Sequence, residues 1–163
     1  MSDPTDGQIR VDRARLEEVQ PLAAEYRRDA SRQGSTVEPP LPTGAVFWVA
    51  RDAAREILGY AAGQLRPEGL VLGPFYVRER ARRLGVGLKL LRAIEEWATG
   101  ARIPVVEVSV AADNPGGVRF LEAAGYRTRR LLMAREDAGT GLPEDDEAAA
   151  DAATGDGVTR TTP

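Results

Sequence analysis

The stretch GLVLGPFYVRERARRLGVGLKLL, residues 69–91, determines how the rest of the chain is arranged. It begins with a run of strand-forming residues, 70–77, in which Gly73-Pro74 interrupts a regular ladder and predicts a bulge or bend. An arginine-rich segment follows, and Gly85-Val86-Gly87 then opens a helix with apolar residues at helical spacing. The stretch therefore predicts a strand, an anion-binding turn and a crossover helix.

A phosphate group suits the start of that helix, because free backbone N–H groups point outward there and glycine lets a bulky anion approach closely. Two common phosphate loops are excluded. A Walker loop needs a Lys followed by Ser or Thr, whereas Gly87 is followed by Leu88 and Lys89 without a hydroxyl residue. A Rossmann fingerprint needs a third glycine where Leu90 stands.

A second segment, NPGGVRFLEAAGY at residues 114–126, has the pattern of a short capped helix. Asn114 suits the N-cap, Pro115 the first helical position and Gly125 the left-handed residue after the helix. The segment follows a predicted strand, 105–111. A strand, a helix and a strand within one sheet require a crossover, so strands 70–77 and 105–111 should lie parallel. The capped helix then begins where open α/β sheets place ligands.

Both segments resemble motifs of the GNAT (Gcn5-related) N-acetyltransferases. Residues 82–87, RRLGVG, match the Arg/Gln-x-x-Gly-x-Gly/Ala signature, and residues 114–126 resemble the later Asn-led helix that runs into Gly-Phe/Tyr. The resemblance covers roughly residues 8–135. It implies an α/β fold, α+β in some schemes, with a mixed, mostly antiparallel central sheet whose parallel, splayed central strand pair is flanked by helices. An unrelated nucleotide-binding α/β domain, with the second motif a coincidence, remains the alternative.

The resemblance also implies a cofactor site for acetyl coenzyme A (acetyl-CoA), which acts as co-substrate without a metal. The pyrophosphate would be held by backbone amides of Arg82, Arg83, Leu84, Gly85, Val86, Gly87 and Leu88. Phe75 and Val77 would pair with the extended pantetheine arm as another strand does, and an amide near Val77 would face the thioester oxygen. Asn114 would contact the pantetheine or its water.

The implied reaction moves the acetyl group to an amine by direct attack. A lysine-like ammonium has a pKa near 10, so a base or water relay helps to deprotonate it. Glu107, the carboxylate inside the apolar strand 105–111, is the candidate base, with Glu79 behind it; a structural ion pair with an arginine is the alternative for Glu107. In many family members a tyrosine acts as the general acid that protonates the departing coenzyme A thiolate, and this chain has Leu121 at that position. Tyr76 or solvent would therefore have to protonate the thiolate.

The remaining elements follow from hydrophobic periodicity and turn residues. A helix is expected from a cap at Asp12 to about Ser31, with Pro21 kinking or restarting it, and a second from residue 86 to near Gly100. A loop is expected at 33–44. Further strands are expected at residues 8–11, 45–50, 57–65 and 127–135.

Composition excludes several classes of chemistry. The chain has no cysteine and no histidine, which removes thiol nucleophiles, disulfides, Cys/His metal sites and serine-histidine triads. No apolar run reaches membrane-spanning length, and the amino terminus has no leader pattern, so we expect a cytoplasmic protein without membrane association. The sequence contains no basic stripe interleaved with aromatic residues, so it does not indicate nucleic-acid binding.

Charge is unevenly distributed along the 163 residues. Residues 136–163 hold eight acidic residues and one arginine, which leaves a net charge of about +4 on the rest. We therefore expect a flexible amino terminus at 1–7, one acetyltransferase domain at 8–135 and an acidic disordered tail at 136–163. A positively charged domain suits a polyanionic cofactor.

The sequence favours a small-molecule amine as acceptor, because no second domain is present to hold a large protein. A protein amine and a homodimer stay open. The alternative function is a non-catalytic domain that binds acetyl-CoA as a sensor or interaction module, which Leu121 keeps open.

Overall fold

The structure is a computed structural model that describes residues 9–32, 41 and 43–131. Its elements, in chain order, are β1 (Arg10–Ala14), α1 (Leu16–Arg32), β2 (Val46–Arg51), β3 (Ile57–Arg66), β4 (Gly69–Val77), the 3-10 helix η1 (Glu79–Ala81), α2 (Val86–Gly100), β5 (Val106–Val108) and α3 (Pro115–Ala123). The described residues up to Arg127 form one compact unit, and Thr128–Leu131 carry neither helix nor strand.

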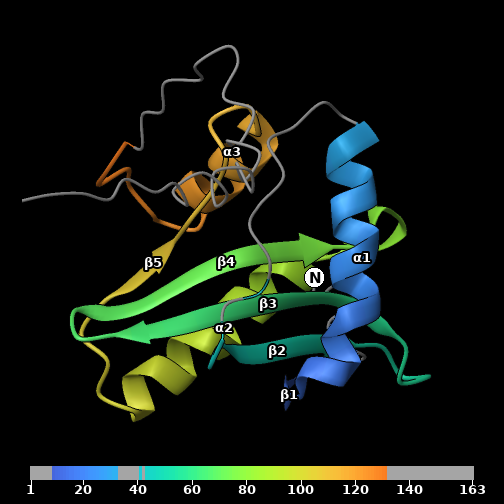
Figure 1. Ribbon diagram of the computed structural model, residues 1–163, viewed down its shortest axis with the longest axis horizontal. Coiled ribbons are helices and arrows are strands. Elements are labelled where there is room, and N and C mark those ends of the chain that lie inside the picture. Colours follow the sequence, from blue (N-terminus) through green and yellow to red (C-terminus); the bar gives the residue numbers. More distant parts are fainter. Residues whose placement is uncertain (1–8, 33–40, 42, 132–163) are drawn as a thin grey trace, which may run out of the picture. The chain divides into compact units, whose positions relative to one another are not determined.

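The strands form one sheet in the order β1-β2-β3-β4-β5 (Figure 1). The first three pairings are antiparallel, and β4 and β5 are parallel. This confirms the predicted mixed, mostly antiparallel sheet with one parallel pair. Among the described strands the pair lies at one edge of the sheet and not at its centre, because no strand follows at residues 127–131. The β4–β5 register runs only from Leu70 opposite Val106 to Leu72 opposite Val108, and β5 then diverges from β4 toward α3 (Figure 1). The pair is therefore splayed.

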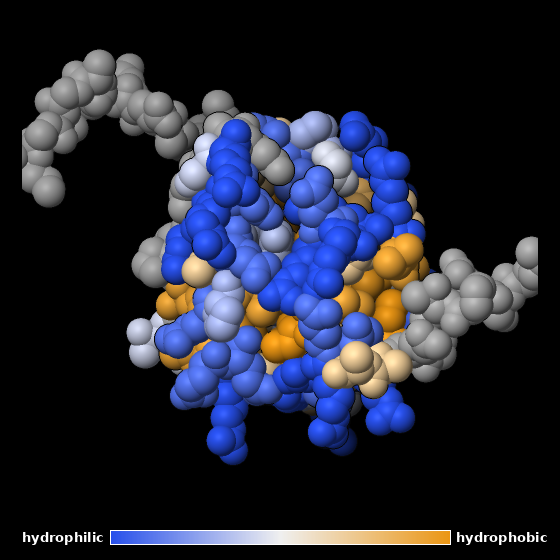
Figure 2. Space-filling model, turned by 90° about the vertical axis from the view of Figure 1, so that its right-hand side faces the viewer, coloured by the Kyte–Doolittle hydropathy of each residue, from blue (hydrophilic) through white to orange (hydrophobic). Residues whose placement is uncertain are grey.

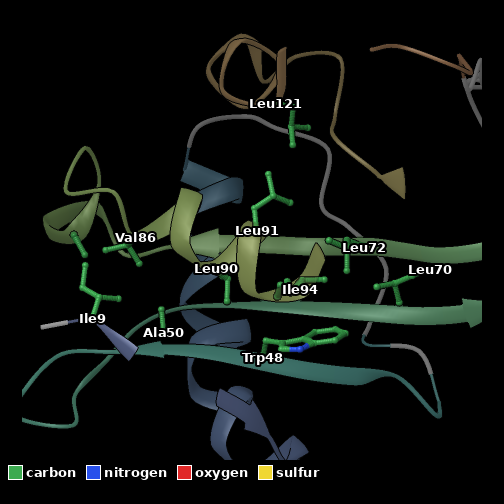
Figure 3. Packing of buried hydrophobic residues seen from close by; sticks show 12 residues of the cluster. Ile9, Trp48, Ala50, Leu70, Leu72, Val86, Leu90, Leu91, Ile94 and Leu121 are labelled. Atoms are coloured by element: carbon green, nitrogen blue, oxygen red, sulfur yellow. The ribbon is translucent and has the colours of Figure 1, made fainter. Parts of the chain in front are cut away.

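Two apolar layers hold the helices on opposite faces of the sheet. Leu90, Leu91 and Ile94 of α2 are buried against one face, whereas Val19 and Leu22 of α1 are buried against the other. Their three- and four-residue spacing places each set on one side of its helix. Figure 3 shows the α2 residues packed toward Trp48, Leu70 and Leu72 of the sheet. The loop before α2 is thereby fixed beside the end of β4.

Several element boundaries differ from the sequence prediction. Strand β1 continues to Ala14, and Asp12 pairs with Val49 inside it, so Asp12 does not cap the first helix. That helix begins at Leu16, where the Arg15 backbone N–H donates to Glu18 Oε2 at 2.8 Å, one half of a capping box. Pro21 lies inside a continuous α1.

Two strand predictions differ from the structure. Strand β5 covers 106–108 instead of 105–111, because the chain turns away from β4 after its third paired residue. The final strand predicted at 127–135 is absent over residues 127–131. Residues 132–135 lie outside the described residues, as do the predicted amino terminus at 1–7, the tail at 136–163 and most of the loop at 33–44.

Candidate active site

The edge of β4 that faces the splayed gap is defined by its hydrogen bonds. The Arg78 backbone N–H donates to Leu58 O of the β3 side at 2.9 Å. In a planar trans peptide the N–H and the preceding C=O point in opposite directions, so Val77 C=O points away from β3. The last hydrogen bond between the β5 segment and β4 lies earlier along β4, where Ser109 N–H donates to Leu72 O at 2.8 Å. Among the described strands, none lies beside Phe75–Val77 on this side.

The predicted irregularity at Gly73-Pro74 occurs at this transition. The peptide between these residues is cis, and the β3–β4 register shifts opposite it, between Ala61 and Gly63. Leu70 and Leu72 turn backbone groups toward β5 before the shift. After the register shift, the Val77 carbonyl points to the same side as those groups. This edge of β4 therefore continues past the end of its pairing with β5.

The loop before α2 presents backbone N–H groups as predicted. The first bond within the helix is donated by Lys89 N–H to Gly85 O at 3.0 Å, so the amides of Val86, Gly87 and Leu88 precede the helical ladder. Gly85 is the N-cap and has no side chain to cap these groups. A Cβ atom built on Gly85 would meet nothing within 4 Å, which leaves room for a bulky anion.

Two residues of the loop have left-handed backbone conformations. Gly85 has φ +76°, and Arg83 has φ +62°, a region that favours glycine. The side chains of Arg82, Arg83 and Leu84 are exposed. The charges of the two arginines and the dipole of α2 all favour an anion at this end.

Phe120 packs against two of the predicted site residues, a contact that the sequence analysis did not predict. Its ring lies 6.0 Å from the Phe75 ring, and a Cβ atom on Gly87 would come within 3.3 Å of Phe120 Cζ and 3.7 Å of Val77 Cγ2. These residues pack together beneath the gap, on the α2 side of the sheet. The signal was its place within the second motif, six residues after Asn114. Glycine at 87 keeps α3 close to the loop.

Asn114 caps α3 as predicted. Its Oδ1 accepts the Gly117 N–H at 2.9 Å, which leaves the Nδ2 group of the exposed side chain to donate. A Cβ atom on Gly117 would lie 2.8 Å from Asn114 Nδ2 and 2.9 Å from Val110 Cγ2. Close packing against these two side chains therefore favours glycine at position 117.

The two candidate catalytic side chains lie on the α1 face of the sheet. Tyr76 packs in the α1 layer, and its hydroxyl donates to Asp29 Oδ2 of α1 at 2.7 Å. Burial and the Asp29 carboxylate raise the pKa of Tyr76 to about 12. Glu107 is half-buried and pairs with Val71; because its neighbours Val106 and Val108 pack on the α2 side, its side chain points to the α1 side.

This geometry disfavours Tyr76 as the acid for a thiolate. Its proton is directed to Asp29, and a donor with a pKa of about 12 gives up a proton poorly to a thiolate whose conjugate acid has a pKa near 8.5. Leu121 cannot serve as the acid either, because its hydrocarbon side chain has no hydroxyl; it is buried in the α2 layer. Glu79, the second candidate base, lies exposed in η1.

An ionic network that the sequence did not reveal holds the end of β4 to α1. Arg78 donates from Nε and Nη2 to both oxygens of Glu25, at 2.9 and 2.7 Å, and from Nη1 to Ile57 O at 2.8 Å. The bonds from Arg78 hold the pKa of Glu25 below its ordinary value. Glu56 in the β2–β3 turn bonds both Arg78 and Arg80. The residue after Val77 is thereby fixed from three directions.

The molecular surface on this side is strongly hydrophilic, with hydrophobic residues visible between the charged ones (Figure 2). A shallow, open hollow of about 650 Å³ lies beside α1. It is lined by Pro21, Ala24, Glu25, Arg27, Arg28, Ser31 and Arg32. Among the described lining residues, three arginines and one glutamate give this hollow a positive charge.

In the described part of the chain, no group of three or more Asp, Glu, His or Cys side chains could hold a metal ion. None of the helices in the same part is long and apolar enough to cross a membrane.

Two curated relatives of this chain are acetyltransferases. Both are L-methionine sulfoximine/L-methionine sulfone acetyltransferases, from Pseudomonas paraeruginosa and Pseudomonas aeruginosa, and each is 35% identical to this chain over 88 residues. The matched segment covers 51% of this chain and 51% of each relative, so the chain spans about half the length of these relatives.

Solved structures show the same fold at low identity. An integron cassette protein from V. cholerae has a TM-score of 0.64 at 16% identity, with 83% of this chain and 95% of that chain covered. An aminoglycoside acetyltransferase from an uncultured soil metagenomic sample, in complex with sisomicin, has a TM-score of 0.59 at 15% identity, with 82% and 97% covered. The family match extends over residues 14–126 and includes both motif segments. The chain therefore belongs to the acetyltransferase (GNAT) family.

Proposed function

We propose that this protein transfers an acetyl group from acetyl-CoA to the amine of a small molecule, by direct attack in a ternary complex. One observation carries the proposal: the edge of β4 at Phe75–Val77, which no described strand pairs with on the β5 side, lies next to the uncapped amino terminus of α2. An extended arm needs such an edge and a pyrophosphate needs such a terminus. The cytoplasmic location expected from the sequence belongs to the same proposal.

The chain's own groups fit acetyl-CoA. The amides of Val86, Gly87 and Leu88, together with the loop from Arg82 to Gly85, would hold the pyrophosphate. Phe75 and Val77 would offer backbone groups to the pantetheine arm, with a Val77-side amide facing the thioester oxygen. Asn114, whose Oδ1 is used by its own helix, would donate from Nδ2.

The chemistry requires a proton acceptor for the amine. Glu107 would take the amine proton, directly or through water, as a C–N bond forms to the acetyl carbon and the C–S bond breaks. A thiol of pKa about 8.5 leaves without strong assistance, so solvent would protonate the thiolate. Tyr76 would serve only after its hydroxyl leaves Asp29.

The hollow beside α1 supports an acceptor that carries a carboxylate. Arg27, Arg28 and Arg32 line it, and arginine binds carboxylates well. The named relatives act on amino-acid analogues. L-methionine sulfoximine and L-methionine sulfone are therefore the first acceptors to test, before peptide amines.

A second candidate function is acetyl-CoA binding without turnover. It is favoured by buried Leu121 and by the bond from Tyr76 to Asp29, which together leave no side-chain acid identified among the described residues. Both candidates require the same cofactor site and differ only in whether thiol is released.

Two measurements test the proposal in sequence. Calorimetric titration with acetyl-CoA should show micromolar binding, and a thiol-release assay with the two methionine analogues should show turnover above the rate without acceptor. Binding without release for any amine would support the sensor, and absence of binding would refute both. Glu107→Gln should lower kcat at neutral pH and leave the affinity for acetyl-CoA unchanged.

A further inference from the structure

Arg82 lies across the position that the pantetheine arm would need. Its Nε donates to Val77 O at 3.0 Å, and its guanidinium carbon lies 6.0 Å from the centre of the Tyr76 ring. The side chain therefore turns back from the loop to the end of β4, although the motif predicts Arg82 in the pyrophosphate loop.

The carbonyl that Arg82 caps is the one that faces the gap. The Arg78 N–H points to Leu58 O on the β3 side, so Val77 C=O points to the side from which β5 has diverged. A strand-like partner of Val77 pairs with both its N–H and its C=O. An arm that entered the gap would thus compete with Arg82 for the Val77 carbonyl.

Releasing Arg82 has a cost that depends on the ligand. A charged donor bound to a carbonyl is worth more than a neutral one, so an amide N–H of an incoming arm does not fully replace it. Arg82 is exposed and belongs to the loop before α2, where a pyrophosphate would provide a stronger partner for the freed guanidinium. Replacing the bond from Arg82 to Val77 O is therefore favourable only for a ligand that carries both an extended arm and a pyrophosphate.

We infer that Arg82 makes the donor site selective for thioesters that carry a pyrophosphate, and against pantetheine thioesters that lack one. The inference rests on the proposed function, since it assumes the gap receives the arm. It assigns Arg82 a role in choosing the donor, in addition to any contact with the anion. Donors attached to a carrier protein through a single phosphate would be disfavoured for the same reason.

The test compares S-acetyl-pantetheine with acetyl-CoA on the wild type and on Arg82→Met. Methionine keeps an apolar stem and removes every donor. NMR titration, which measures millimolar dissociation constants, should show that Arg82→Met binds S-acetyl-pantetheine about three- to tenfold more tightly than the wild type and acetyl-CoA more weakly. The ratio of the two affinities should fall by more than tenfold.

Arg83→Met is the matched control. Arg83 is the adjacent exposed loop residue, and no contact to Val77 is described for it, so this variant should lose affinity for acetyl-CoA and leave S-acetyl-pantetheine unchanged. If Arg82→Met does not gain affinity for S-acetyl-pantetheine while the wild type binds acetyl-CoA, the inference alone is wrong. If the wild type does not bind acetyl-CoA, the proposed function fails and the inference fails with it.

Discussion

The two ends of the site are built in different ways. At the loop end, the groups offered to a ligand are backbone amides, and the left-handed residues Arg83 and Gly85 set their direction. At the α1 end, the groups are side chains from elements far apart in the sequence, such as Tyr76 with Asp29 and Arg78 with Glu25.

The difference explains which part of the site a single sequence reveals. A backbone-built site restricts the residue types along a short segment, because few residues adopt positive φ or cap a helix. A site built from side-chain pairs places no such restriction on neighbouring positions. It follows that perturbing the loop should change cofactor affinity most, whereas perturbing the α1 end should change stability and acceptor use.

The largest effect is expected for Gly85→Val. Its φ of +76° disfavours a β-branched residue, and the new side chain would occupy the open space beside the amides of α2. Affinity for acetyl-CoA should fall more than tenfold in a calorimetric titration, with a loss of stability of about 1–2 kcal/mol.

Gly44→Val separates backbone strain from ligand contact. Gly44 has φ +75° and also has nothing within 4 Å of a built Cβ, but it lies before β2 and away from the loop. This variant should lose similar stability and keep its affinity. Equal affinities in the two variants would contradict the pyrophosphate assignment.

Arg78→Ala should have the next largest effect, on stability. The Arg78 and Glu25 side chains are only 20% and 30% exposed, so truncation leaves Glu25 partly buried without its cation. The free energy of unfolding in urea should fall by about 2 kcal/mol. Arg80→Ala, at a residue 60% exposed, should change it by less than about 0.5 kcal/mol. Similar losses in both variants would mean that the partial burial of the Arg78–Glu25 pair adds no stability beyond that of an exposed pair.

Because the Tyr76 hydroxyl has a raised pKa in the folded state, we expect the protein to lose stability at alkaline pH. The pKa of Tyr76 is raised to about 12 in the folded state, so the stabilisation is fully present below pH 10 and is lost as the pH rises toward 12. Between pH 9 and pH 11 the wild type should lose about 1.4 kcal/mol through this group. Tyr76→Phe should lack that part of the loss in urea unfolding at both pH values. Some loss should remain, because the pKa of Tyr126 is raised as well by burial and Glu95.

Arg83→Gly should have the smallest effect. It tests whether backbone amides or side chains of the loop hold the anion. Glycine relieves the left-handed strain at φ +62° but adds unfolded-state entropy, so stability should change by less than about 0.5 kcal/mol. Affinity for acetyl-CoA should fall two- to fivefold through loss of one charge. A loss as large as that of Gly85→Val would show that side chains, and not amides, hold the anion.

Much of the fold followed from the sequence because its signals are local. The parallel pairing of 70–77 with 105–111 followed from the crossover rule, and Asn114 was recognised as a cap from its place before Pro115. The length of β5 could not be predicted, because apolar residues continue to Ala111 while the chain already leaves the sheet after Val108. The cap at Asp12 was wrong because pairing with Val49 extended β1 past it.

The α1 end could not be predicted for a different reason. Asp29 and Tyr76 are 47 positions apart, and Glu25 and Arg78 are 53 apart. Many arginines and carboxylates along the chain could form such pairs, and only the packing of α1 over β2, β3 and Tyr76 of β4 selects among them. Phe120 was overlooked because an aromatic residue in an amphipathic helix is ordinarily part of the core.

Amide-resolved NMR titration with acetyl-CoA tests the central claim most directly, because the claim concerns particular backbone groups. The account predicts the largest shifts at the amides of Phe75, Val77, Val86, Gly87 and Leu88, with smaller shifts on α1. Saturable binding that shifts mainly the α1 residues 24–32 and leaves the loop amides unchanged would contradict it.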